Sequence, residues 1–347
     1  MTERRRWLIL ADGYLTERNA KTAHGVIQYS PDEIAAVLDR EHAGSSVKQV
    51  LPELGRDAPI VRTVADGMLH EPTHFLLGVA TPGGWIPEFW RGWIRDALKS
   101  GLHVVSGLHS FLQDDSEYVE LARRNNVSLW DVRQPPPDIP LFSGRTLEVP
   151  QKIVSTVGSD CAVGKKTTAL ELTVAAKRAG KNAEFIATGQ TGVLIAGKGI
   201  VVDRVVADFV AGAAEQLVCD AAAGTDVVVV EGQGSLWHPA YSGVTLGLLH
   251  GSTPHAMVLC HQAGRDAIEE PPFTKLPPLT EMIATYESMA SSIRPAKVAA
   301  ISLNCKGLEP EAAEAVIATT ERDTGLPVAD VFTGGADKLW AAVAAAL

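Results

Sequence analysis

A glycine-rich stretch between an apolar segment and a long helical pattern constrains the fold of this chain more than any other feature. Residues 158–168 read Gly-Ser-Asp-Cys-Ala-Val-Gly-Lys-Lys-Thr-Thr. The β-branched residues of 152–157 predict a buried strand, and residues 166–179, which stop at Gly180, predict a helix. Strand, glycine-rich turn, lysine and helix in this order indicate a phosphate-binding loop in an α/β sheet.

Each residue type in this stretch has a physical part in holding an anion. Glycines let the backbone curl so that N–H groups point inward, and the helix N-terminus adds partial positive charge. Five residues separate the glycines and a second lysine precedes the threonines, which departs from the common spacing. A glycine turn that only caps a helix is the alternative. The residues expected to bind the cofactor are Gly158, Ser159, Asp160, Cys161, Gly164, Lys165, Lys166, Thr167 and Thr168.

Composition and charge exclude several classes of protein. A length of 347 residues fits two domains, and 46% hydrophobic with 21% charged residues excludes wholesale disorder. The net charge of −10 argues against nucleic-acid and membrane partners, which need a basic surface. No apolar run approaches the ~20 residues of a membrane span. The cysteines lie far apart, which favours free thiols and a cytoplasmic location (Cys161, Cys219, Cys260 and Cys305).

A proline-rich segment at residues 134–140 divides the sequence, because consecutive prolines cannot continue a helix or an interior strand. We expect a Rossmann-like domain over residues 1–133, a linker over 134–150 and a P-loop domain over 151–347. The fold class is α/β, with an N-terminal Rossmann-like parallel sheet and a C-terminal P-loop NTPase-like, doubly wound domain. In the first half the patterns predict strands at 7–11, 74–79, 103–106 and 127–132, and helices at 31–40, 87–100 and 115–125.

The first half offers fewer chemical signals. No G-x-G-x-x-G follows its first strand, so dinucleotide binding there is a minor hypothesis. Residues 21–25 and 81–85 read Lys-Thr-Ala-His-Gly and Thr-Pro-Gly-Gly-Trp. We interpret both as loops that face a ligand, with plain connectors as an equal alternative. The sequence leaves a homo-oligomer open without marking a dimer face.

The second half contains further apolar strands that end in polar residues. Residues 226–230 lead into Glu231, 255–260 lead into His261, and 296–303 lead into a segment at 304–306. Ligands of open α/β sheets bind at the carboxyl ends of the strands. We therefore expect the glycine-rich loop and these strand ends to form one site for a small-molecule substrate.

Two resemblances follow from these motifs. The second half resembles the dethiobiotin-synthetase branch of P-loop proteins, through GSDCAVGK at 158–165, VEGQGS at 230–235 and SLNCKG at 302–307. The whole chain more closely resembles a bacterial family long described only as a P-loop domain of unknown function. That resemblance is carried by GSDCAVGKKTTALEL from residue 158, ATGQTG at 187–192 and VVEGQGSLWHPAYSG at 229–243.

The second resemblance implies a D-glutamate N-acetyltransferase that takes its acetyl group from acetyl-CoA in a catabolic step. The loop would then hold the phosphates of coenzyme A. The first resemblance implies an alternative, an ATP- and Mg²⁺-dependent ligase or kinase with Thr167 and Glu231 at the metal. A sensor of nucleotide or coenzyme A without catalysis is a third interpretation.

Acyl transfer to an amine needs a base, donors for the oxyanion and a partner for the substrate carboxylate. The candidate catalytic residues are His238, Glu231 and His261, although a histidine in such a loop is as often structural. The candidate substrate-binding residues are Arg265, Gln190 and Tyr241. Cys161 lies near a helix N-terminus, where the pKa of a thiol can fall, so an acyl-cysteine intermediate is a further alternative.

Overall fold

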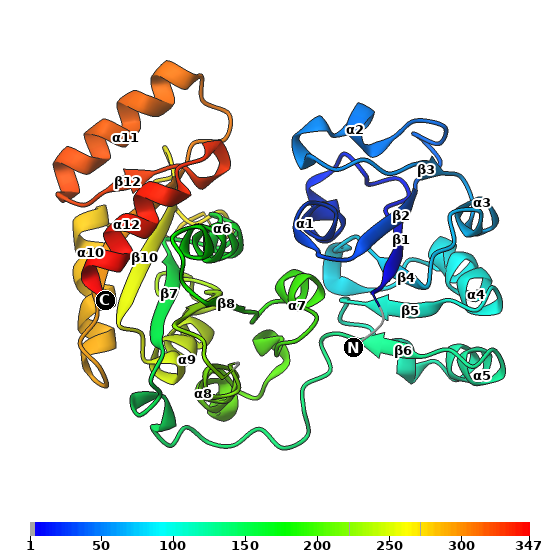
Figure 1. Ribbon diagram of the computed structural model, residues 1–347, viewed down its shortest axis with the longest axis horizontal. Helices are drawn as coiled ribbons and strands as arrows, with labels where there is room; N and C mark the ends of the chain where they lie inside the picture. The colour runs from blue at the N-terminus through cyan, green and yellow to red at the C-terminus, as the bar shows by residue number, and fades with distance from the viewer. Residues whose placement is uncertain (1–3, 222, 271) are drawn as a thin grey trace. The chain divides into compact units, whose positions relative to one another are not determined.

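The computed structural model describes residues 4–221, 223–270 and 272–347. The chain divides into two compact units (Figure 1). Unit 1 contains Met1–Pro135 and Val193–Arg204, and unit 2 contains Pro136–Gly192 and Val205–Leu347. No helix among the described residues combines the length and hydropathy that a membrane crossing requires.

Unit 1 contains a parallel sheet of six strands within the described residues, in the order β3-β2-β1-β4-β5-β6. This order, with its reversal between β1 and β4, is that of a Rossmann fold. The strands are β1 (Arg6–Leu10), β2 (Glu33–Leu38), β3 (Ile60–Val61), β4 (His74–Leu77), β5 (His103–Ser106) and β6 (Leu129–Asp131). The helices are α1 (Lys21–Tyr29), α2 (Val47–Val50), α3 (Val64–Met68), α4 (Arg91–Lys99) and α5 (Ser116–Arg124).

Two sequence predictions for this unit are wrong. Residues 31–40, predicted as a helix, contain strand β2, in which every residue after Glu33 is buried. A surface helix buries only one face, whereas a strand between two neighbours in a parallel sheet is covered on both faces. Residues 21–25, predicted as a loop, form the first turns of α1. The predicted strands at 7–11, 74–79, 103–106 and 127–132 and helices at 87–100 and 115–125 are confirmed, the first of these helices beginning as a 3₁₀ turn at Glu88–Trp90.

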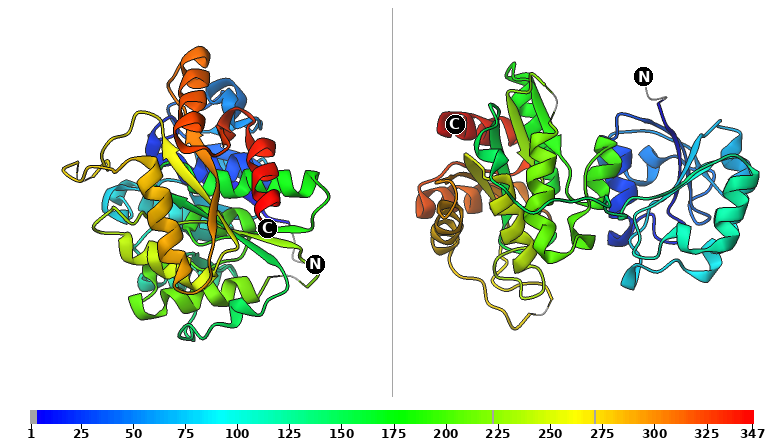
Figure 2. Two further views of the ribbon diagram at one scale, coloured as in Figure 1. Left: turned by 90° about the vertical axis from the view of Figure 1, so that its left-hand side faces the viewer. Right: turned by 90° about the horizontal axis from the view of Figure 1, so that it is seen from below.

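Unit 2 contains a second parallel sheet, of six strands in the described chain, in the order β12-β11-β10-β7-β9-β8. Figure 2 shows its helices on both faces of the sheet. The strands are β7 (Lys152–Gly158), β8 (Ala183–Ile186), β9 (Val227–Val230), β10 (Ala256–Gln262), β11 (Lys297–Asn304) and β12 (Val328–Ala329). The helices are α6 (Lys165–Arg178), α7 (Gln190–Ala196, which runs into unit 1), α8 (Val210–Cys219), α9 (Ser242–Ser252), α10 (Leu279–Ser291), α11 (Pro310–Thr324) and α12 (Ala336–Ala346).

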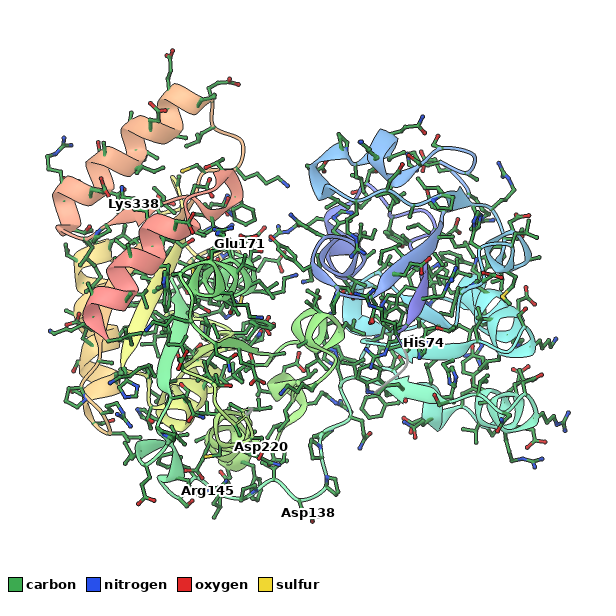
Figure 3. All side chains as sticks on the ribbon, viewed as in Figure 1. His74, Asp138, Arg145, Glu171, Asp220 and Lys338 are labelled. Atoms are coloured by element: carbon green, nitrogen blue, oxygen red, sulfur yellow. The ribbon has the colours of Figure 1, made fainter. Side chains whose placement is uncertain are left out.

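Apolar side chains fill the space between this sheet and its helices (Figure 3). On one face, Leu172 of α6 and Leu339 of α12 pack with Val229 and Val258 of the strands. On the other face, Tyr286 of α10 packs with Leu259 and neighbouring apolar residues. Burial on both faces explains why these strands are continuous apolar runs in the sequence.

Candidate functional site

The glycine-rich loop follows β7 and leads into α6, as the sequence predicts. Gly158 is the last residue of β7, and α6 begins at Lys165. Gly164 precedes the helix with φ of 110°, a conformation that other residues rarely adopt. A helix that begins directly after such a turn directs backbone N–H groups toward the loop, where they can bind an anion.

Side chains from neighbouring elements hold the loop backbone in place. The Tyr286 hydroxyl donates to the carbonyl oxygen of Gly158 at 2.7 Å. The Ser235 hydroxyl donates to the carbonyl oxygen of Ser159 at 2.7 Å. The Ser159 hydroxyl in turn lies 2.8 Å from Nδ1 of His261. The predicted base His261 therefore contacts the loop, and burial, followed by the nearby Arg265, lowers its pKa to about 4.

The ammonium group of Lys165 lies inside the loop. Its Nζ donates to the carbonyl oxygen of Asp160 at 2.6 Å, and the side chain is almost completely buried. Burial lowers the pKa of Lys165, an effect that the nearby acidic groups oppose, Cys161 first among them. The loop thus places a cation and a helix N-terminus together, which suits it to an anionic or polarised oxygen.

The buried Asp160 and the half-buried Arg265 form an ion pair at the edge of the loop. The Arg265 Nη1 lies 2.5 Å from Oδ2 of Asp160, and its Nη2 donates to Gln262 Oε1 at 2.6 Å. Backbone N–H groups of Cys161 and Glu269 also donate to the Asp160 carboxylate, at 2.6 and 2.9 Å. Arg265 stays a prediction for the substrate carboxylate, in competition with the carboxylate it already binds.

Glu231 lies directly after β9 and binds the backbone that follows β8. Its Oε2 accepts the N–H groups of Thr188 and Gly189, both at 2.9 Å. Burial raises the pKa of Glu231, while these two hydrogen bonds act in the opposite direction. A Cβ on Gly192 would lie 2.3 Å from Oε2 of Glu231, so the carboxylate fits only against a glycine. Its predicted roles as base or magnesium ligand stay predictions, as does substrate binding by Gln190, which begins α7.

His238 and Tyr241 lie in the segment after β9. His238 is buried, and its Nδ1 accepts the N–H of Ala240 at 3.2 Å. Its ring centroid lies 4.3 Å from that of Tyr241, which is 46% exposed. Among the described residues, the ligand atoms of His238, Asp160 and Cys161 all lie within 4.8 Å of one another. This proximity brings a predicted base to the glycine-rich loop.

The polar residues at the start of α6 face different environments. Thr168 is fully buried and its hydroxyl lies 2.8 Å from the Ser302 hydroxyl of β11, so it contacts the sheet and not the loop interior. Thr167 and Lys166 are partly exposed. Of the two threonine hydroxyls, that of Thr167 is therefore the one available for the predicted magnesium site.

Sequence reasoning missed the residues that support the loop from outside. Ser235 lies within the noted motif at 230–235, but nothing in the motif predicts its bond to Ser159. Tyr286 lies more than a hundred residues from Gly158, and its position in α10 gave no signal of the contact. The Asp160–Arg265 pair joins two predicted site residues whose mutual contact the sequence did not indicate.

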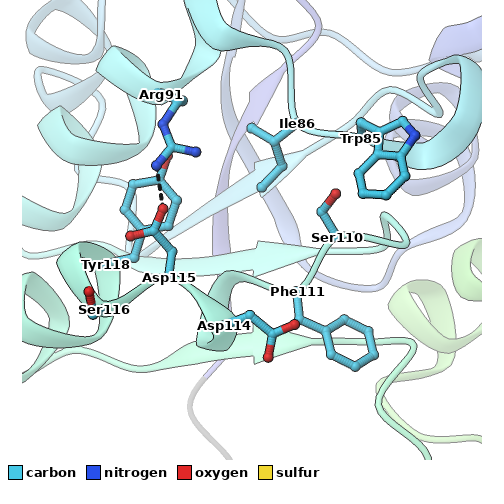
Figure 4. Close-up of a pocket in the computed structure, with 9 residues that line it drawn as sticks. All are labelled: Trp85, Ile86, Arg91, Ser110, Phe111, Asp114, Asp115, Ser116 and Tyr118. Atoms are coloured by element: carbon cyan, nitrogen blue, oxygen red, sulfur yellow. Dashed lines mark hydrogen bonds and ion pairs between the residues drawn. The ribbon is translucent and has the colours of Figure 1, made fainter.

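A cavity of about 460 Å³ lies in unit 1 (Figure 4). Its lining includes Trp85, Phe111 and the ion pair of Arg91 with Asp115. Trp85 belongs to the predicted ligand-facing residues 81–85 and is 70% exposed. A ligand for these residues stays a prediction.

Known proteins resemble the chain over most of its length. Models of a domain of unknown function, DUF1611, match in two parts, a Rossmann-like domain at residues 40–135 and a P-loop domain at 140–340. A protein from Pseudoalteromonas sp. is 38% identical over 266 residues, which cover 76% of this chain and 79% of that protein. A protein from Tritonibacter scottomollicae is 35% identical over 327 residues, 94% of each chain.

Both of these relatives are named D-glutamate N-acetyltransferase. The crystal structure of a DUF1611 family protein from Anabaena variabilis matches the structure with a TM-score of 0.93. That protein is 39% identical, and the match covers 99% of this chain and all of the other. The predicted α/β class, with a Rossmann-like N-terminal and a P-loop C-terminal domain, is confirmed.

Proposed function

The chain belongs to the DUF1611 family, and from this premise we propose that it is an N-acetyltransferase that moves an acetyl group from acetyl-CoA to the amino group of D-glutamate. The observation that carries the proposal is the similarity to two relatives of that name over 76% and 94% of the chain. The reaction is proposed to serve the breakdown of D-glutamate. The four cysteines of the described residues form no disulfide, which suits a reducing, cytoplasmic location.

The glycine-rich loop has the features that acyl transfer requires. A thioester carbonyl develops negative charge on its oxygen during attack, and preorganised donors stabilise that charge. The first turn of α6 and the Lys165 ammonium provide such donors in a buried setting. A neutral amine must attack, so a base has to lie within hydrogen-bond reach of it. His238 beside the loop is the proposed base.

The acceptor needs partners for two carboxylates. Arg265 lies beside the loop and has a planar guanidinium that pairs well with a carboxylate. We propose that it contacts the substrate through guanidinium N–H groups other than those that bind Asp160 and Gln262, in competition with the Glu269 carboxylate, which lies 3.5 Å from Nη2. Because Asp160 fixes the guanidinium, the Arg265 side chain is oriented before the substrate binds.

The test is release of free thiol from acetyl-CoA by the purified protein without ATP or Mg²⁺. We expect release with D-glutamate and none with L-glutamate. Lys165→Ala should slow it by ~10²-fold or more, as removal of an oxyanion donor does. Lys177→Ala, an exposed change at the other end of α6, is the matched control and should leave the rate unchanged.

Absence of thiol release, together with ATP hydrolysis once ATP and Mg²⁺ are added, would replace the proposal with the ligase or kinase alternative. Saturable binding of acetyl-CoA without turnover of any amine would instead indicate a sensor. Equal rates with the two glutamate enantiomers would refute the assigned stereochemistry alone.

A further inference from the structure

The glycine-rich loop carries a cysteine next to a histidine and an aspartate. The Asp160 carboxylate, the Cys161 thiol and the His238 imidazole have their ligand atoms within 4.8 Å of one another. Asp160 and His238 are buried, whereas Cys161 is partly exposed and therefore open to a small molecule. Groups of these types at this spacing either hold a metal ion or support a thiolate nucleophile.

The charges around the cluster distinguish these two uses. Lys165 reaches into the loop and donates to the backbone of Asp160 at 2.6 Å. The proximity of Cys161 opposes the effect of burial on the pKa of Lys165. Arg265 already neutralises Asp160, and the fourteen-residue helix α6 begins four residues after Cys161. With the charge of Asp160 offset by Arg265, the remaining positive charge comes from Lys165 and the N-terminus of α6, which disfavour a divalent metal ion and stabilise an anionic sulfur.

We propose that Cys161 accepts the acetyl group from acetyl-CoA, with His238 as its base, so that transfer to D-glutamate passes through an acetylated Cys161. The role of His238 follows from its contacts. Its Nδ1 accepts the N–H of Ala240 at 3.2 Å and is therefore the unprotonated nitrogen of the neutral ring, so it takes the thiol proton as this long hydrogen bond breaks. The ring also packs against Tyr241, with a centroid separation of 4.3 Å.

The two steps balance in atoms and charge. His238 takes the thiol proton, the sulfur of Cys161 attacks the carbonyl carbon of acetyl-CoA, and the bond from that carbon to the coenzyme sulfur breaks. Coenzyme A leaves as a thiolate and receives the proton from His238. The neutral amine of D-glutamate then attacks the acetyl-cysteine, the carbon–sulfur bond breaks, and the amine proton returns to the sulfur of Cys161 through His238. Each step exchanges one acyl bond and requires no oxidant or reductant.

This inference assigns the loop to the thioester end of the donor. The long pantetheine arm separates the thioester of coenzyme A from its phosphates, so one bound molecule cannot present both ends to Cys161. The backbone N–H groups at the start of α6 and the Lys165 ammonium then face the carbonyl oxygen. The phosphates of the donor would lie outside the loop, in contrast to the sequence prediction.

The inference rests on the proposed function, and the test separates the two. The 347-residue chain is incubated with acetyl-CoA alone and quenched in acid, and its intact mass is measured by mass spectrometry. In a second assay, exchange of labelled coenzyme A into acetyl-CoA is followed without an amine. We expect one acetyl group on wild type, located at Cys161 by peptide mapping, and measurable exchange. Cys161→Ser and Cys161→Ala should lose both signals. Cys219→Ser, which alters another partly exposed thiol, should keep both.

His238→Gln should slow acetylation by ~10²-fold or more, the usual contribution of a general base. D-glutamate added to the isolated acetyl-protein should remove the acetyl group and yield the N-acetyl product. The intermediate would be overturned, with the proposed function intact, by one combined result. In that result D-glutamate is acetylated without exchange or acetyl-protein, and Cys161→Ala keeps full activity. Acetylation of Cys161 that D-glutamate does not discharge would support the nucleophile and refute the acceptor. If the protein shows no acetylation, no exchange and no turnover of D-glutamate, both the intermediate and the proposed function are refuted.

Binding of the phosphate end provides an independent arm. If adenosine 3′,5′-bisphosphate binds to wild type and Lys165→Ala abolishes that binding, the loop holds phosphates and the thioester assignment is wrong. If Lys165→Ala leaves this binding unchanged while acetylation of Cys161 slows, the loop acts on the thioester.

Discussion

Substitution of Gly232 by alanine tests how closely the segment after β9 packs on β7. The Gly232 N–H donates to the Thr156 hydroxyl at 2.9 Å. A Cβ at this position would lie 1.8 Å from the carbonyl oxygen of Thr156, 2.9 Å from its carbonyl carbon and 3.2 Å from Cδ of Lys165. The two backbones would have to separate by more than about 1 Å, and Thr156 belongs to the buried strand β7, where such shifts are resisted.

The expected cost combines two terms. Overpacking a close-packed interior costs about 1–3 kcal/mol, and loss of the hydrogen bond to Thr156 adds about 1 kcal/mol. We therefore expect Gly232→Ala to lower the free energy of unfolding of unit 2 by about 3 kcal/mol. With the denaturant dependence usual in guanidinium chloride, the midpoint falls by about 0.5–1.5 M.

Equilibrium unfolding in guanidinium chloride, followed by circular dichroism and by tryptophan fluorescence, measures this change. The two probes are needed because two compact units need not unfold in one transition. Gly243→Ala is the matched control, since a Cβ there meets no atom within 4 Å and alanine favours the helix α9. A Gly232→Ala midpoint equal to that of wild type would refute the packing argument.

Two further predictions concern the groups around the loop. Burial lowers the pKa of His261 to about 4, against 6.5 in the unfolded chain. Between pH 6.5 and 4 the unfolded chain therefore binds a proton that the folded state does not bind. Stability is therefore lost as pH falls from 6.5 to 4, by about 3 kcal/mol from this residue. His261→Gln should reduce the slope of the denaturant midpoint against pH over that range without abolishing it, because burial also lowers the pKa values of His74 and His255 to about 4. An unchanged slope would contradict the assignment. Arg265→Met should cost about 3–5 kcal/mol of unfolding free energy, because it leaves the buried Asp160 carboxylate without its cation. Adding Asp160→Asn to that variant should recover part of the loss in a double-mutant cycle, whereas additive losses would show that the two side chains do not stabilise each other.

The elements with strong local signals were predictable from the sequence. The strand at 152–157, the loop and the helix at 166–179 are found as β7, the loop and α6, because apolar burial, glycines and helix propensity agree there. The helix prediction for residues 31–40 is wrong because tertiary packing overrides the local sequence signal. Ser30 and Pro31 form a good helix start, but the Ile-Ala-Ala-Val-Leu run that follows is buried between β1 and β3, and this burial outweighs the local signal.

The site was predictable as a set of strand ends, and its internal contacts were not. Topology alone brings Gly158, Glu231 and His261 to one edge, since β7 pairs with both β9 and β10. Which partner each side chain selects depends on rotamers and on atoms from distant segments. For that reason the sequence did not indicate that Arg265 binds Asp160, while its contact with a substrate carboxylate stays a prediction.

The sheet order also explains how a loop of unusual length keeps a defined shape. β7 lies between its two neighbours, with Gly158 beside Cys260 of β10 and Ser155 beside Val230 of β9. Side chains that hold the loop therefore reach it from both sides, Ser235 from the segment after β9 and His261 from β10. A loop fixed by contacts at both flanks tolerates an extra residue between its glycines, because its conformation does not depend on its own spacing alone. The segment after β9 that supplies Ser235 also supplies His238, whose ligand atom lies within 4.8 Å of those of Asp160 and Cys161.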